Sequence, residues 1–411
     1  MSNTRTKALA NSKTDYFRLE NRLVLLGWLN SLFGFEHNRD LFKELAGTGE
    51  GWDSSGRSHV VSRLLSRGDQ CMLKETELCR YDANIRRHLA SMNRVRVEKI
   101  TLRYFQYLAA LYTEIFLDRL FNHPKRLLTN LNRFVSDRNA KRVLEETPDP
   151  VFTADDLQKL AFWMATGSGK TLLMHLNYRQ FLHYNKKPLD NILLVTPNEG
   201  LTQQHLEQFA ASGIPAERFD LQNSGLFSSR RHVVRVTEIT KFVEEKKGDG
   251  ASVPIEAFQG RNLIFVDEGH KGAGGEAFMK YRDVIAKEGF TFEYSATFGQ
   301  ALHAAGNDSL TREYAKAIGF DYSYRYFYGD GFGKDFNILN LRRTQSHDET
   351  DILLMANLLS FYEQSLYFDT HGAKLKPYNL ATPLWLFIGN KVTAIYTEKG
   401  EKRSDVLSVV Q

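Results

Sequence analysis

The sequence predicts an α/β protein in which a parallel sheet, covered by helices on both faces, follows a mainly helical segment. Three observations lead to this prediction. From residue 151 onward, apolar strand-like runs alternate with helical stretches, the pattern of a parallel sheet. A glycine-rich loop at 164–171 follows one of these runs and opens a helix. Residues 1–150 instead carry the apolar spacing of helices.

Residues 1–150 are predicted to form a mainly helical domain. Heptad-like apolar spacing occurs over 23–32 and over 100–121. The second stretch is the most apolar helix candidate, but it contains four charged residues: Arg103, Glu114, Asp118 and Arg119. We therefore expect a helix buried in protein and no membrane span. A Thr-Pro-Asp-Pro turn at 147–150 marks the end of the domain.

Residues 151–330 are predicted to hold the sheet. Its strands are expected at 162–165, 192–196, 233–239, 263–266 and 290–295. The aromatic run at 320–328 can stack bases or fill a core, and we favour the core. Residues 331–380 are predicted to be a linker.

The loop at 164–171, MATGSGKT, has the composition of a phosphate-binding loop. Glycines let successive backbone N–H groups face an anion, and the following helix adds the positive end of its dipole. Lys170 would reach the β- and γ-phosphates, and the Thr171 hydroxyl would be a ligand of Mg²⁺. Met164 stands where the strict pattern has glycine. The residues predicted to bind the nucleotide in this loop are Thr166, Gly167, Ser168, Gly169, Lys170 and Thr171.

A second candidate element is the DEGH stretch at 267–270, which directly follows a predicted strand. Acidic side chains at the carboxyl end of a parallel strand lie where open α/β sheets bind ligands. Because phosphoryl transfer needs a metal ligand and a group that positions and deprotonates water, we assign Asp267 to Mg²⁺ and Glu268 to the water. Together with Lys170, we count Asp267, Glu268 and His270 as catalytic residues.

In order and separation, MATGSGKT, DEGH and the SAT sequence at 295–297 resemble motifs I, II and III of superfamily two helicases and translocases of the DEAD/DEAH type. The sequences MATGSGKT and DEGHKG are similar to the motifs of the restriction-subunit branch, which includes the motor subunits of type III restriction enzymes. The resemblance implies a first RecA-like ATP-binding lobe at 151–330 and the beginning of a second one at 381–411. It also implies that Ser295 and Thr297 couple the nucleotide state to nucleic-acid contact.

Weaker matches add further candidate residues. Thr196 and Pro197 resemble motif Ia, in which a Thr-Pro turn touches the nucleic-acid backbone, and Thr240 could make a similar contact. An ordinary strand with its loop explains both segments equally well. The LRYFQ sequence at 102–106 resembles an LRxxQ element whose glutamine recognises adenine. This implies that Gln106 binds adenine, because an amide offers a donor and an acceptor together.

The composition is that of an ordinary globular chain of 411 residues, 42% hydrophobic and 25% charged, with a net charge of +5. Cys71 and Cys79 cannot supply a zinc site or a disulfide framework, and the polar N-terminus has no secretion signal, so we expect a cytoplasmic protein. The basic excess lies in residues 1–150. These basic side chains could neutralise nucleic-acid phosphates or simply face solvent, and both interpretations remain open.

Together these features predict an ATP-dependent helicase or translocase motor of the restriction or phage-defence type. ATP and Mg²⁺ are its expected cofactors. The nucleic acid along which it moves is expected to be DNA or else RNA, and its candidate partners are nuclease or modification subunits.

In the family, the second lobe supplies an arginine finger, which typically raises the rate of hydrolysis by a factor on the order of 10³ to 10⁵. No QxxGRxxR-like segment follows Gly389, so we expect little coupled hydrolysis from these residues alone. The alternative is a nucleotide-binding half-motor that regulates a defence complex without hydrolysis. A P-loop kinase is disfavoured, because it would lack the DEGH and SAT pair.

Overall fold

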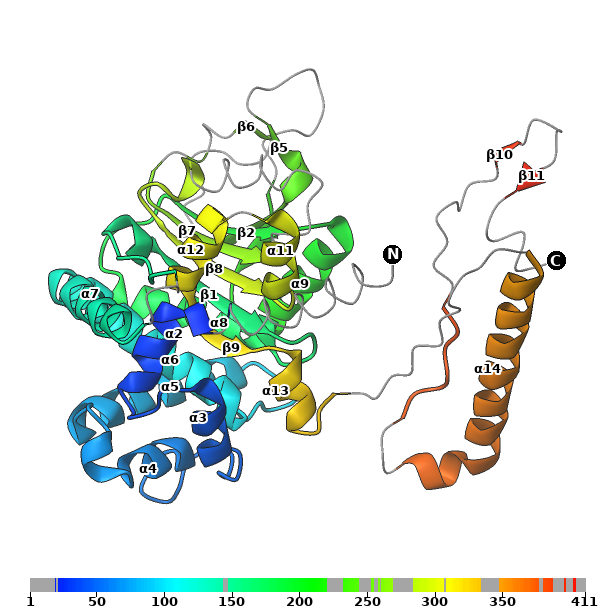
Figure 1. Ribbon diagram of the computed structural model, residues 1–411, viewed down its shortest axis with the longest axis horizontal. Coiled ribbons are helices and arrows are strands. Elements are labelled where there is room, and N and C mark those ends of the chain that lie inside the picture. Colours follow the sequence, from blue (N-terminus) through cyan, green and yellow to red (C-terminus); the bar gives the residue numbers. More distant parts are fainter. Residues whose placement is uncertain are drawn as a thin grey trace. The chain divides into compact units, whose positions relative to one another are not determined.

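The structure is a computed structural model of the chain (Figure 1). It describes residues 19, 21–142, 147–219, 232–243, 253–254, 258, 260–268, 284–306, 308–333, 347–376, 380–386, 395–396 and 402–403. The chain divides into two compact units, 1–334 and 335–411. All candidate site residues named above fall in the first unit. The finer domain limits drawn from the sequence stay a prediction.

The first part of the chain is helical, as predicted. Its helices are α2 (Val24–Ser31), α3 (Asn38–Leu45), α4 (His59–Leu65), α5 (Glu75–Asn93), α6 (Tyr104–Asn122) and α7 (Pro124–Ala140), with a 3-10 turn at Gly68–Gln70. Helix α6 is buried over most of its length, and its charged Asp118 accepts a hydrogen bond from Arg80 at 2.7 Å. Among the described residues we find no helix with the length and apolarity that a membrane crossing requires.

A seven-stranded sheet follows, in the order β3-β4-β2-β7-β8-β1-β9, and every neighbouring pair in it is parallel. Its strands are β1 (Lys159–Met164), β2 (Asn191–Thr196), β3 (Ala216–Arg218), β4 (Val234–Glu238), β7 (Asn262–Asp267), β8 (Phe290–Ser295) and β9 (Ile318–Tyr322). The five predicted strands are all present, so the α/β RecA-like fold class is confirmed. The two edge strands, β3 and β9, had no prediction.

Helices and short elements connect these strands. The helices are α8 (Lys170–Tyr184), α9 (Glu199–Ala211), α11 (Phe298–Ala305), α12 (Asp308–Ala317) and α13 (Tyr324–Gly329). The short elements are 3-10 turns at Asp155–Gln158 and Ile239–Lys241 and the two-residue strands β5 (Phe242–Val243) and β6 (Val253–Pro254). The second unit holds α14 (His347–Leu375) and the paired strands β10 (Ile395–Tyr396) and β11 (Lys402–Arg403). The expected start of a second lobe lies mostly outside the described residues.

The central strands β2 and β7 are buried on both faces, which explains why their sequences are nearly continuous apolar runs. In β2, Ile192 and Leu194 belong to the large core cluster on one face of the sheet, whereas Leu193 and Val195 belong to a smaller cluster on the other face. A strand covered on both faces has no polar side to expose. Such burial favours unbroken apolar strands over the alternating ones of a half-exposed sheet.

The N-terminal helices share one core with the sheet. Helix α2 lies against the edge strand β9, where a Cβ built on Gly319 would sit 3.5 Å from both Leu25 and Leu29. Helix α6 lies against α8, and Gln180 of α8 donates a hydrogen bond to the carbonyl of Ala110 at 2.8 Å. Figure 1 shows α6 beside α8 and β9. The helical segment is therefore built into the fold of the sheet.

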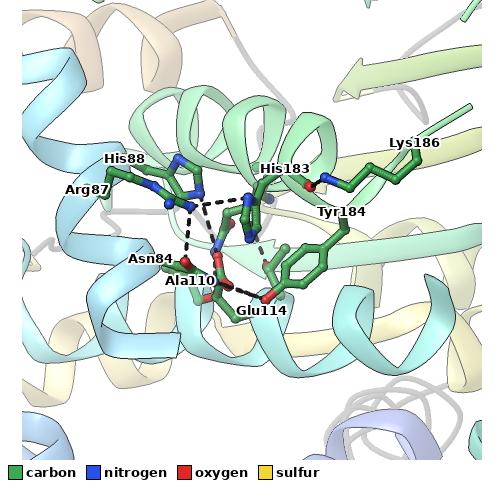
Figure 2. A network of polar contacts seen from close by, with 11 residues as sticks. Asn84, Arg87, His88, Ala110, Glu114, His183, Tyr184 and Lys186 are labelled. Carbon is green, nitrogen blue, oxygen red and sulfur yellow. Dashed lines mark hydrogen bonds and ion pairs between the residues drawn. The ribbon is translucent and has the colours of Figure 1, made fainter. Parts of the chain in front are cut away.

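A buried polar network joins α5, α6 and α8 (Figure 2). The Glu114 carboxylate accepts hydrogen bonds from Tyr184 at 2.6 Å, from Gln180 at 2.9 Å and from Asn84 at 3.0 Å. Burial raises the pKa of Glu114 to about 6, although these three hydrogen bonds lower it. Burial also lowers the pKa of the neighbouring His88 to about 3. The helix that begins at the glycine-rich loop is thus held by groups whose charge depends on pH.

The aromatic run at 320–328 divides between core and surface. Phe320 and Tyr322, in β9, are fully buried, in line with the favoured prediction. Tyr324 and Tyr328, in α13, are 43% and 47% exposed. The side chains change from buried to exposed where β9 ends at Tyr322 and α13 begins at Tyr324.

Candidate nucleotide-binding site

The glycine-rich loop lies between β1 and α8, at the carboxyl edge of the sheet. Gly167 and Gly169 have φ angles of +84° and +96°, in the left-handed region that glycine adopts without strain. Ser168 is buried, and its hydroxyl donates to the carbonyl of Ala165 at 2.7 Å. Thr166 and Gly167 are exposed. The loop thus has a tight, internally bonded base and an open outer turn.

Lys170, the first residue of α8, brings the loop together with the DEGH stretch. Its Nζ lies 3.1 Å from Oε1 of Glu268 and 3.4 Å from the carbonyl oxygen of Met164. The two charged side chains are only 13% and 9% exposed. Two motifs separated by nearly a hundred residues of chain therefore meet in a buried ion pair.

Glu268 is held from several sides. Its φ of +53° is in the left-handed region, unusual for a residue with a Cβ, and its N–H donates to the carbonyl of Tyr294 at 2.9 Å. Its Oε2 accepts from the Ser295 hydroxyl at 3.0 Å, and its Oε1 accepts from the N–H of Ala296 at 3.2 Å. Strained residues held this way are frequent at functional sites.

The SAT turn is itself fixed by hydrogen bonds. The Ser295 hydroxyl accepts from the N–H of Thr297 at 2.9 Å, and Trp163 of β1 donates its indole N–H to the carbonyl of Ala296 at 3.1 Å. Ser295 is buried and Thr297 is half-buried. The third motif therefore contacts the second through Glu268, and β1 through Trp163.

Asp267 is the last residue of β7. Its Oδ2 accepts a hydrogen bond from Nε2 of His205 in α9 at 2.9 Å. Both side chains are nearly buried, at 11% and 3% exposed. This contact was not expected from the sequence, because 62 residues separate the two positions.

The residues present fit a Mg²⁺ ion bound together with a nucleotide. Asp267 offers a carboxylate and Thr171, half-buried in the first turn of α8, offers a hydroxyl; these are the hard oxygen ligands that Mg²⁺ prefers. Within the described parts of the chain, no group of three or more His, Cys, Asp and Glu side chains could hold a metal by itself. Mg²⁺ sites of this type use only one or two carboxylates and complete the coordination with water and phosphate oxygens.

Gln106, far upstream in the sequence, contacts the glycine-rich loop. Its Nε2 donates to the carbonyl of Ser168 at 2.9 Å, and its Oε1 accepts from the N–H of Arg103 at 3.1 Å. A Cβ on Gly169 would lie only 2.5 Å from Gln106 Nε2. Both ends of the amide therefore bond to protein, and the glutamine braces the loop from the side of α6.

Aromatic and cationic side chains lie beside this contact. The Phe327 ring edge is 3.7 Å from a Cβ built on Gly167. The Arg103 guanidinium lies 4.3 Å from the centre of the Phe332 ring. Phe327 thus lies against the outer turn of the glycine-rich loop, and its ring centre is 5.7 Å from that of Phe332.

The candidate nucleic-acid contacts lie at the carboxyl ends of the adjacent strands β2 and β4 and in the residues that follow them. The Thr196 hydroxyl is buried and bonds to the Thr202 hydroxyl at 2.7 Å, while Pro197 is half-buried. Thr240 lies in the 3-10 turn after β4, on the same carboxyl edge because β2 and β4 are parallel. His270 lies outside the described residues. The assignments of all these residues stay predictions.

The chain matches one family model and has weak structural similarity to two solved structures. Residues 119–300 match the family model described as Type III restriction enzyme, res subunit. A structure of the UvsW helicase from bacteriophage T4 is 15% identical with a TM-score of 0.29, covering 50% of this chain and 77% of that one. A second T4 UvsW structure is 14% identical with a TM-score of 0.30, covering 63% of this chain and 56% of that one. No curated protein sequence matches the chain.

The family match spans the glycine-rich loop, the DEGH stretch and the SAT turn, the three motifs that the structure brings to one edge of the sheet. Over residues 119–300, the chain is thus similar to the type III restriction enzyme res-subunit family.

Proposed function

We propose that this chain is the ATP-binding part of a DNA helicase or translocase motor of the restriction or phage-defence type. The contact between Lys170 and Glu268, at 3.1 Å beside Asp267, carries the proposal. It unites a phosphate-binding loop with a carboxylate pair, the two parts that ATP hydrolysis requires. The res-subunit domain supports the motor class.

We assign the phosphate contacts to the loop and to the start of α8. The backbone N–H groups around Gly167 and Gly169 would cradle the phosphates, and Lys170 would neutralise charge on the β- and γ-phosphates. Thr171 and Asp267 would hold Mg²⁺, which neutralises developing charge on the phosphate oxygens when bound. Gln106 would contact the adenine edge through the second N–H and the second oxygen lone pair of its amide, because the first of each already bonds to Ser168 and Arg103.

We assign the proton transfer to Glu268. A water oxygen attacks the γ-phosphorus, the bond to the β,γ-bridging oxygen breaks, and Glu268 accepts the proton of the water. Ser295 and the N–H of Ala296 each hold one carboxylate oxygen of Glu268, so a movement of the SAT turn would move the base. This connection supports a coupling role for Ser295 and Thr297.

The track is proposed to bind along the carboxyl edge, near Thr196, Pro197 and Thr240. Hydroxyl and backbone N–H groups in loops are common phosphate contacts, and they carry little base specificity. The basic residues of the N-terminal region would add electrostatic attraction, which weakens as the salt concentration rises. The proposed partners are nuclease or modification subunits. The proposed location is the cytoplasm.

Nucleotide binding and turnover test this proposal. Lys170→Ala should abolish binding of a fluorescent ATP analogue. Glu268→Gln should still bind the analogue and, in any longer product of the same gene that hydrolyses ATP, should block hydrolysis. The matched controls are Lys187→Ala and Glu207→Gln, two exposed positions away from the site. Equal nucleotide affinity in Lys170→Ala and Lys187→Ala would overturn the assignment of the nucleotide-binding site.

ATPase assays with duplex DNA, single-stranded DNA and RNA separate the motor from the regulator. The motor predicts turnover that rises with DNA, in this chain or in any longer product of the same gene. Tight nucleotide binding without DNA-stimulated turnover in either form would support the regulatory half-motor instead. ATP hydrolysis by this chain at a rate that does not change when nucleic acid is added would contradict the motor proposal.

A further inference from the structure

His205 makes a buried contact with the nucleotide site that the proposed mechanism has not used. Its Nε2 lies 2.9 Å from Oδ2 of Asp267. A carboxylate can only accept, so the imidazole donates this hydrogen bond. It occupies one carboxylate oxygen, restricts the rotamer of Asp267, and favours Oδ1 as the oxygen that would meet a metal ion.

The surroundings of His205 hold the ring but give it little other polar contact. Its ring centre is 6.4 Å from that of Phe209, one turn later in α9, and Phe209 in turn stacks on His175 of α8 at 4.5 Å. The Nδ1 atom of His205 is buried, and no described residue bonds to it. A buried imidazole with an unpaired nitrogen is costly, so packing alone does not account for histidine at this position.

The same helix begins at the loop proposed to contact nucleic acid. Asn198 caps α9 by accepting a hydrogen bond from the N–H of Leu201 at 3.0 Å. Thr196, the last residue of β2, shares a 2.7 Å hydrogen bond with Thr202 in the first turn of α9. His205 follows Thr202 by three residues and lies on the same face of the helix. A displacement of the loop would therefore move His205 with it.

We infer that His205 is a positioning residue that holds the Asp267 carboxylate for Mg²⁺, and that α9 thereby joins the loop at 196–198 to the nucleotide site. The inference rests on the proposed function, because it takes Asp267 as a metal ligand. Hydrogen-bond donors behind a metal ligand set its orientation, and their loss commonly weakens metal binding by about 10- to 100-fold.

A Mg²⁺ titration without turnover tests the positioning role. Binding of a fluorescent, non-hydrolysable ATP analogue is followed as Mg²⁺ is added to the full chain. His205→Leu should raise the Mg²⁺ concentration at half-maximal binding by about tenfold or more. Its affinity for the analogue in EDTA should stay unchanged, because Lys170 and the loop amides remain. Gln203→Leu, on the exposed face of α9, is the matched control.

Two amide variants keep the test decisive if His205→Leu does not fold. The glutamine amide reaches about as far as Nε2 of histidine, so His205→Gln should restore a Mg²⁺ midpoint near that of the wild type. The asparagine amide is one methylene shorter, so His205→Asn should show the raised midpoint. Equal midpoints in the two amide variants, or a His205→Leu midpoint equal to that of Gln203→Leu, would overturn the inference.

The coupling is tested by repeating the Mg²⁺ titration with duplex DNA. By linkage, DNA that acts through α9 must shift the Mg²⁺ midpoint of the wild type. The shift should be lost in His205→Leu and kept in Gln203→Leu. Equal shifts in wild type and His205→Leu, including no shift in either, would overturn the coupling.

Failure of this inference and failure of the proposed function look different. A wild-type chain that binds no nucleotide at any Mg²⁺ concentration would overturn both. A wild-type chain that binds nucleotide with Mg²⁺, loses binding in Lys170→Ala and is insensitive to His205 would overturn the positioning role alone.

Discussion

At the scale of single residues, two left-handed backbone positions shape the site. Gly169 adopts φ of +96° directly before α8, and Glu268 adopts φ of +53° directly after β7. The first is easy for glycine, whereas the second is strained for a residue with a Cβ. Both lie where a strand ends and the chain must turn sharply. Their conformations place Lys170 and Glu268 in contact.

Gly169→Ala is expected to damage both stability and binding. The new Cβ would adopt an unfavourable φ and lie 2.5 Å from Gln106 Nε2, so the free energy of unfolding should fall by about 1–3 kcal/mol. The displaced loop should also bind nucleotide more weakly. Urea unfolding and an ATP-analogue titration would measure the two effects.

Gly47→Ala is the control for this substitution. A Cβ at Gly47 meets nothing within 4 Å, so this variant should unfold and bind like the wild type. If Gly169→Ala matched Gly47→Ala in both measurements, the bracing of the loop by Gln106 would be refuted.

At the scale of elements, the network around Glu114 connects three helices through a titrating carboxylate. Burial raises the pKa of Glu114 from 4.5 to about 6. An acid whose folded-state pKa is raised contributes stability that is complete below its unfolded pKa and is lost as the pH rises through its folded pKa. For Glu114 this loss falls between about pH 4.5 and pH 6.

Glu114→Gln is expected to remove this pH dependence. The difference in the free energy of unfolding, variant minus wild type, should increase by about 2 kcal/mol between pH 4 and pH 8. This change does not depend on the size of the difference at pH 4. Burial lowers the pKa of His88 and His175 to about 3, which destabilises the fold in acid. Both histidines are present in both proteins, so their contribution largely cancels in the difference.

Thermal unfolding at several pH values would measure the difference. Glu207→Gln, on the exposed face of α9, should show no such trend. A constant difference between Glu114→Gln and the wild type across this range would show that Glu114 does not titrate in it.

At the scale of the whole molecule, the N-terminal helices and the sheet share one hydrophobic core. The large core cluster contains side chains of α2 and α6 together with side chains of β1, β8 and β9. Removing the helices would expose the β9 surface near Gly319 and the face of α8 that carries Gln180. The covered strands have no polar side with which to meet water.

Two fragments are expected to behave differently. Residues 1–334 should unfold cooperatively and keep the nucleotide affinity of the full chain, because both core clusters lie within them. Residues 151–334 should show no cooperative transition. Circular dichroism on heating and size-exclusion chromatography would compare them. A cooperative, nucleotide-binding 151–334 fragment would contradict the shared core.

Much of the fold could be predicted because it depends on local patterns. Strands β1, β2 and β7 are nearly continuous apolar runs, β4 and β8 alternate as strands do, and α6 is apolar over most of its surface, so these elements are recognisable in the sequence. The edge strand β3, the three residues Ala216–Arg218, carries no such mark. The other edge strand, β9, lies in an aromatic run whose pattern did not distinguish a strand from other core elements.

The sequence by itself determined which residues can carry phosphate chemistry, because a glycine-rich loop and an acidic pair after a strand are local features. Only the tertiary structure decided which of them meet. Parallel strands bring their carboxyl ends to one edge, where Lys170 reaches Glu268 and His205 reaches Asp267 across 62 residues. Gln106 reaches Ser168 in the same way, from a helix that shares the core. Such contacts depend on strand order and helix packing, which separation along the chain does not encode.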